Sequence, residues 1–218
     1  MRQSMRMNSL HYRVLVIILV YGILKFMGGS FGALLLYPVT LFVTFLHEMG
    51  HALGALFTGG DVVGMQINAN GSGFTQTRGG NIAVVLMGGY IGSAILGNIL
   101  FYIGARKKAM TQFTLQALAL LMLLAGVVWF QSLQSTGILI VFALVLLFIA
   151  ARTNWDQQVL MFLGLAAVLY IIEDFNVGPS SDLAMYEQHV GGPAGMWMYV
   201  WLILAGGLSL WNIKQIFS

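Results

Sequence analysis

The stretch ALLLYPVTLFVTFLHEMGHALGALF, residues 33–57, decides which class of protein this chain belongs to. Its first half is almost wholly apolar, and its second half carries two histidines and a glutamate. A helix rises about 1.5 Å per residue, so a helix over 33–57 is long enough to cross the ~30 Å hydrocarbon core of a bilayer. The stretch therefore predicts a membrane helix that carries ionisable side chains.

The composition of the whole chain agrees with a membrane protein. Of its 218 residues, 59% are hydrophobic and 8% are charged, against roughly 45–50% and about 25% in soluble domains. This composition excludes a disordered chain and a conventional nucleic-acid-binding protein, so we expect no nucleic-acid partner. The chain has no cysteine, which excludes disulfide scaffolds and thiolate metal sites. We expect one integral, multi-pass membrane domain over residues 1–218.

Apolar runs predict an all-α polytopic fold of about seven, or six to seven, transmembrane helices. The expected spans are 13–28, 33–57, 81–104, 112–130, 136–151, 157–174 and 195–213. In the six-span alternative, 112–130 and 136–151 form one span and a re-entrant piece. The first span follows a basic head, and we interpret it as an uncleaved helix rather than a removed signal peptide. Residues 62–80 are too polar to cross, and Asn70-Gly71 predicts a β-hairpin with a two-residue turn between spans two and three.

The motif His47-Glu48-Met49-Gly50-His51 carries the chemistry. Residues four apart lie on one face of a helix, so both imidazoles can reach one Zn²⁺. Glu48 follows directly and can act as general base on a water in the open metal position. In the alternative, both histidines bond to neighbouring helices and Glu48 is a neutral acid or a proton relay.

The segment HEMGHALGALFTGGDVVGMQINANGSGFTQTRGG resembles the site-2 protease group of intramembrane zinc metallopeptidases, and it looks closest to the short branch without extra domains. The later stretches MGGYIGSAILGN, LYIIEDF and SSDLAMY are similar to that branch as well, although the Leu-Asp-Gly stretch of the larger enzymes is absent. The resemblance implies a zinc-activated water that cleaves peptide bonds in or near the membrane. It also implies a hairpin edge strand to which an unwound substrate adds; a plain polar connector is the alternative.

A catalytic zinc takes three protein ligands and one open position, so a third ligand is needed besides the histidines. Segment 173–193 holds four of the seven acids. We favour Asp174, because it ends the predicted sixth span, where its backbone is held rigidly. Asp182 is the alternative, since it follows a Pro-Ser-Ser helix start that already gives it a local role. The remaining candidates in this segment are Glu173, Glu187 and His189.

Topology supports this placement. With seven spans, the end of span two, the hairpin and the loop after span six fall on one side of the membrane. The same count puts Arg78 of the hairpin on the side of the N-terminus. Asn98, on the small-residue helix that contains Gly88, Gly89, Gly92 and Gly97, is interpreted as a bridge between helices, with contact to a substrate backbone as the alternative.

These features predict a zinc metalloendopeptidase, a hydrolase of the site-2 protease type. It would hydrolyse peptide bonds of membrane-embedded polypeptides through a metal-activated water. The cofactor is Zn²⁺, the metal residues are His47, His51 and Asp174 (alternative Asp182), and Glu48 is catalytic. The alternative function is a non-catalytic membrane protein, a transporter or assembly factor, that keeps a structural metal site. The sequence leaves the substrate and the oligomeric state open.

Overall fold

The computed structural model describes residues 2–173, 175, 177–179 and 181–218, and for residues 2–9, 172 and 173 it describes the backbone alone. The elements, in chain order, are α1 (Arg2–Gly22), the π-helical η1 (Ile23–Met27), α2 (Gly29–Phe57), β1 (Asp61–Ile67), β2 (Gly73–Arg78), α3 (Ile82–Met87), the π-helical η2 (Gly88–Gly92), α4 (Ser93–Arg106), α5 (Lys108–Val128), α6 (Leu133–Arg152), α7 (Asp156–Glu173), α8 (Asp182–Val190) and α9 (Ala194–Phe217).

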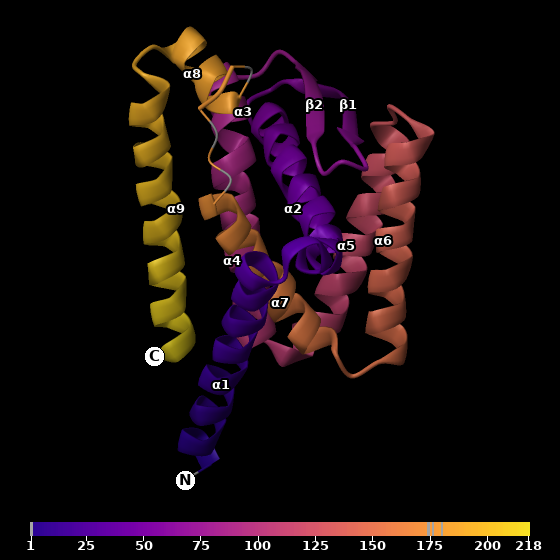
Figure 1. The fold of residues 1–218 in the computed structure, drawn as a ribbon. Helices are drawn as coiled ribbons and strands as arrows, with labels where there is room; N and C mark the ends of the chain where they lie inside the picture. Colours follow the sequence, from indigo (N-terminus) through magenta and orange to yellow (C-terminus); the bar gives the residue numbers. More distant parts are fainter. Residues whose placement is uncertain (1, 174, 176, 180) are drawn as a thin grey trace.

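The predicted polytopic helical fold is confirmed. Six helical segments among the described residues are long and apolar enough to cross a membrane, namely Leu10–Met27, Gly29–Phe57, Ile82–Arg106, Lys108–Val128, Leu133–Arg152 and Ala194–Phe217. Helix α7 supplies a shorter apolar segment, Asp156–Ile171. Helices α5 and α6 are separate and pack side by side, so the merger of 112–130 and 136–151 is wrong (Figure 1). The side chain of Ser132 caps α6 at the turn between them, which lets the chain reverse there.

The hairpin is confirmed as a two-stranded antiparallel sheet. Its turn is longer than the predicted two residues, because Ile67 pairs with Gly73 and residues 68–72 form the loop. The Asn70 side chain accepts a bond from the backbone N–H of Ser72, at 3.0 Å, and Gly71 adopts a φ of 88°. Asn70 and Gly71 therefore lie in the turn, as the sequence predicted, but the loop has five residues instead of two.

One end of the molecule gathers the elements that matter for the site. Figure 1 shows the end of α2, the hairpin, α3 and α8 together at the top, as the topology argument predicted. Both termini lie at the opposite end, so the expectation that Arg78 shares a side with the N-terminus is wrong. The reason is the junction of α1 and α2. It lies near the middle of the body in this view, and α2 continues from there toward the hairpin instead of packing antiparallel along α1.

The core is centred on the second half of α2, where Phe42, Phe45, Leu46 and Met49 are fully buried. Helix α4 makes its largest contact with α7. The Asn98 side chain of α4 bonds to Ser209 of α9 and to Asn212 of α9, which confirms that Asn98 bridges helices. The second half of the motif-bearing helix is therefore enclosed, and its ionisable residues have neighbours on several sides.

Candidate metal centre

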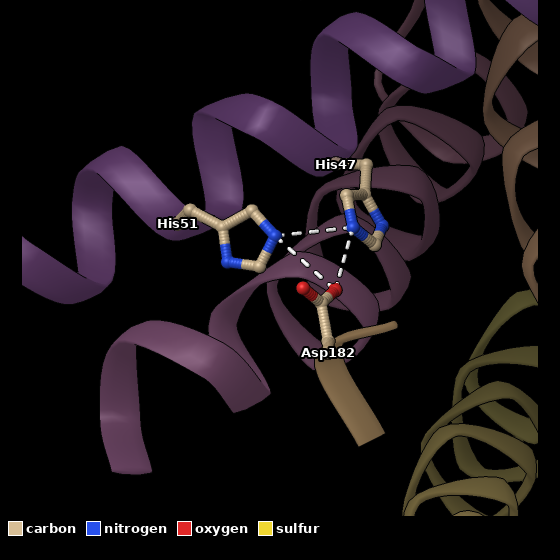
Figure 2. Close-up of side chains that lie close together, drawn as sticks. All are labelled: His47, His51 and Asp182. Atoms are coloured by element: carbon tan, nitrogen blue, oxygen red, sulfur yellow. Dashed lines mark hydrogen bonds and ion pairs between the residues drawn. The ribbon is translucent and has the colours of Figure 1, made fainter. Parts of the chain in front are cut away.

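The two histidines of the motif lie one turn apart on α2 and point to the same place. Their Nε2 atoms are 3.1 Å apart, and their rings meet edge to face with centroids 4.8 Å apart. This geometry follows from the helical i, i+4 spacing. Figure 2 shows both imidazoles turned toward a third side chain, Asp182.

Asp182 is the first residue of α8 and lies 135 positions from His47 in the sequence. Its Oδ2 is 2.9 Å from Nε2 of His47 and 3.3 Å from Nε2 of His51. The side chain of Ser181 caps α8 by accepting from the N–H of Ala184, so the start of this helix is fixed. Burial acts to raise the pKa of the Asp182 carboxyl, but the hydrogen bonds from both histidines outweigh it and hold that pKa below its ordinary value. This shift favours the ionised carboxylate, which is the form that binds a metal ion.

Neighbouring elements fix the orientation of the histidine rings. Nδ1 of His51 lies 2.7 Å from the carbonyl oxygen of Val85 on α3. Because a carbonyl oxygen can only accept, Nδ1 carries a proton, and Nε2 is the nitrogen that would bind a metal ion. The His47 ring stands perpendicular on Tyr90, with centroids 4.8 Å apart.

Gly89 lies directly against the two ring nitrogens. A Cβ atom added to Gly89 would be 2.6 Å from Nε2 of His47 and 2.6 Å from Nε2 of His51. Only glycine leaves room there for the rings as they stand. The helix that carries Gly89 therefore forms a close wall of the site.

Glu48 lies beside this group and is held by the hairpin. It is 4% exposed, and its Oε2 accepts a bond from the Thr75 hydroxyl at 2.8 Å. Its Oε1 would be 2.7 Å from a Cβ added to Gly73, so β2 passes immediately over the carboxylate. Glu48 and His47 line a cavity of about 160 Å³ together with Val43, Thr44, Gly71, Ser72, Gly73, Tyr90, Tyr170 and Ile171.

The structure places the predicted site residues as follows. His47 and His51 meet Asp182, the alternative third ligand, and these three form a group whose ligand atoms all lie within 4.8 Å of one another. Asp174, the favoured candidate, lies outside the described residues, and so does the side chain of Glu173.

Two further candidates in that segment make other contacts. Glu187 accepts a bond from the backbone N–H of Ala194, at the start of α9, and Nδ1 of His189 contacts the carbonyl oxygen of Met185. Both contacts are local, within α8 or from α8 to the next helix. These contacts give each side chain a structural role away from the group of three.

Sequence reasoning missed the residues that support the group. Gly89 was interpreted only as part of a packing face, and Tyr90 and the Val85 carbonyl were not considered. Thr75 had a usable signal, because alternation along 73–78 puts Gly73, Thr75 and Thr77 on one face of the strand. That face turns toward α2.

The donor set fits a divalent metal ion. Two imidazoles and one carboxylate form a ligand set typical of catalytic zinc sites, which keep a further position open. The close approach of Gly89 and the hydrogen bond from His51 to the Val85 carbonyl hold the histidine rings in one orientation. Residues that do not themselves bind the ion commonly orient metal ligands in this way. Within the part of the chain that the structure describes, no other group of three or more His, Cys, Asp or Glu side chains is arranged to hold an ion.

Comparison with known proteins adds a family. A family model described as Peptidase M50B-like matches residues 12–212. No curated protein and no solved structure matches the chain. The matched range covers the motif, the hairpin, α8 and most of α9.

Proposed function

The chain belongs to the Peptidase M50B-like family, a group of site-2 protease-like membrane metallopeptidases, and from this premise we propose that it is an intramembrane zinc endopeptidase. Its substrates are membrane-embedded polypeptides, and the reaction is hydrolysis of a peptide bond. One observation carries the proposal. Two helical histidines and a distant aspartate converge on one point, next to a buried glutamate that lines a cavity.

His47, His51 and Asp182 are the proposed zinc ligands. Asp182 is preferred to Asp174 because one of its oxygens lies within 3.3 Å of Nε2 of both histidines. A zinc ion bound by these groups supplies Lewis acidity and makes a water more acidic at neutral pH. The three ligands come from α2 and α8, so the two helices must both be in place for binding.

Glu48 is the proposed general base. It takes a proton from the attacking water and delivers it to the amine that leaves. The Thr75 hydroxyl, 2.8 Å from Oε2, holds the carboxylate in one orientation and leaves Oε1 for the proton transfer. Burial beside the cavity keeps bulk water from competing for these hydrogen bonds.

The outer edge of β2 is the proposed binding surface for the substrate backbone. The N–H groups of Met65 and Ile67 in β1 bond to Trp129 and Ser135, on the side away from β2. In an antiparallel pair, two residues directly opposite each other either both direct their backbone N–H and C=O groups toward the other strand or both direct them away from it. Gly73 and Thr75, their partners in the register, therefore direct backbone groups toward the outer edge of β2. An extended peptide can add there by β-augmentation, close to Glu48.

The test compares Glu48→Gln with wild type and with Glu187→Gln as the matched control. We expect Glu48→Gln to retain about one zinc per chain and to lose cleavage of a single-span reporter in proteoliposomes. Glu187→Gln keeps an acceptor for the N–H of Ala194 and should cleave normally. Cleavage by Glu48→Gln would remove the base role from Glu48. Zinc-loaded wild type that cleaves no membrane reporter would favour a metal-binding protein without catalysis.

A further inference from the structure

Aromatic side chains form a continuous cluster between His47 and α8. The His47 ring meets Tyr90 edge to face, and the Tyr90 ring lies tilted against Trp201, with centroids 5.8 Å apart. Trp201 in turn meets Tyr186 edge to face, with centroids 5.1 Å apart. Aromatic rings attract one another at these separations. The rings therefore connect the motif-bearing helix α2, through η2 and α9, to α8.

Tyr186 lies one helical turn after Asp182, on the same face of α8. Helix α8 has nine residues, and a helix of this length is not stable by itself. Its position must therefore come from contacts with the rest of the protein. The buried side chains of α8 are Leu183 and Tyr186. The packing of Tyr186 thus contributes directly to where the Asp182 carboxylate lies.

Trp201 of α9 is the ring that links the two ends of this cluster. It is 1% exposed and contacts both Tyr90 and Tyr186. Trp197, one turn earlier on α9, also meets Tyr186, with centroids 4.8 Å apart, and its indole N–H donates to the carbonyl oxygen of Gly191 at 2.7 Å. The printed contacts of Trp197 stay at the corner between α8 and α9, whereas Trp201 also reaches the ring that packs on His47.

We propose that Trp201 is a positioning residue, which holds α8 so that the Asp182 carboxylate meets His47 and His51 before a metal ion binds. This inference rests on the three ligands of the proposed function. A site that is assembled for only part of the time binds its ligand more weakly, in proportion to the assembled fraction. If loss of the Trp201 ring leaves α8 docked for about a tenth of the time, zinc binding weakens about tenfold.

The first measurement is the zinc Kd of the full-length protein, by competition with a chelator of known affinity. We expect Trp201→Leu to bind zinc about tenfold more weakly than wild type. Trp201→Phe keeps an aromatic ring between Tyr90 and Tyr186, so its Kd should stay within about threefold of wild type. Trp211→Leu is the matched control, because it removes a tryptophan of the same helix that is 60% exposed, and it should bind zinc normally.

A double-mutant cycle shows whether Trp201 acts through Asp182. In an Asp182→Ala background, Trp201→Leu should cause no further loss of zinc affinity, because the ligand that it positions is gone. An equal tenfold loss in both backgrounds would mean that Trp201 supports the fold as a whole, and it would overturn the inference. If Trp201→Leu does not fold, Tyr186→Leu removes the other ring of the same contact and should give the same loss and the same cycle.

The second measurement is a distance in the metal-free protein. The chain has no cysteine, so nitroxide labels can be placed at Gln188→Cys on α8 and Phe57→Cys on α2, both exposed positions. Pulsed electron paramagnetic resonance should give one narrow distance distribution in wild type, with or without zinc. In Trp201→Leu the distribution should be broad without zinc and narrow with saturating zinc, because the metal then holds α8 in place.

The outcomes separate this inference from the proposed function. Wild-type zinc affinity in Trp201→Leu, or a narrow distribution in its metal-free form, overturns the positioning role. Wild-type zinc affinity in Asp182→Ala removes Asp182 from the ligands and overturns the positioning role as well. Protein that gives the expected affinities and distances but cleaves no membrane reporter lacks the proposed peptidase activity, and the role of Trp201 stands.

Discussion

Replacement of Gly89 by alanine tests whether zinc binding requires the absence of a Cβ atom at position 89. The added Cβ would lie 2.6 Å from Nε2 of each histidine, whereas carbon atoms in contact need about 3.5 Å. The rings must therefore retreat by about 1 Å from the positions at which they meet Asp182. A displacement of this size at reacting groups costs on the order of 100-fold, so we expect zinc affinity to fall about 100-fold, or ~2.7 kcal/mol.

The assay is competition of purified protein with a zinc chelator of known affinity, alongside thermal unfolding of the metal-free protein. Gly89 has no positive φ, and alanine in a helix is more favourable than glycine by roughly 0.5–1 kcal/mol, so the metal-free variant should remain folded. Gly137→Ala is the matched control, because a Cβ there meets no atom within 4 Å. Unchanged zinc affinity in Gly89→Ala would refute the argument that these two rings bind the metal where the structure holds them.

Two further predictions concern the third ligand and the orientation of the chain. Asp182→Ala should lower zinc occupancy strongly, while Glu187→Ala leaves it near the wild-type level, as measured by metal analysis. Equal zinc occupancy in the two variants would assign the ligand role to another acid, with Asp174 the first to test. Eight of the ten Lys and Arg residues lie in α1, at the α4–α5 junction, at the end of α6 or near the end of α9, namely Arg2, Arg6, Arg13, Arg106, Lys107, Lys108, Arg152 and Lys214. Figure 1 shows these segments toward the end of the molecule where both termini lie. Cytoplasmic ends carry such an excess, so tags at either terminus should be accessible from the cytoplasm alone, and labelling from the opposite face would contradict this.

The parts of the site that depend on local geometry could be predicted from the sequence. The spacing of His47 and His51 fixes their common face on any helix, and the polarity of residues 62–80 with the Asn70-Gly71 pair favoured a hairpin outside the membrane over a plain polar connector. The position of Asp182 could not be predicted, because it depends on how α8 packs against α3 and α9. The argument for Asp174 assumed that rigidity requires a membrane span. In the structure a short helix is fixed equally well, by the Ser181 cap and by burial of Leu183.

The junction of α1 and α2 explains why the N-terminus was expected at the wrong end of the molecule. Hydropathy gives the length of an apolar run but not the direction in which the next helix leaves it. The π-helical turn at Ile23–Met27 lets α2 continue toward the hairpin. Counting spans alone assumes that each one reverses the chain, and this junction does not.

The long separation between His47 and Asp182 has a consequence for biosynthesis. A ribosome makes α2 and the hairpin early, and 135 residues pass between the first histidine and the aspartate. Until α8 has emerged and packed, the nascent chain offers the metal only an imidazole pair, which is a weak and incomplete ligand set. With the proposed ligands and the proposed peptidase function, the nascent chain therefore lacks a complete catalytic site until α8 has been made and has packed.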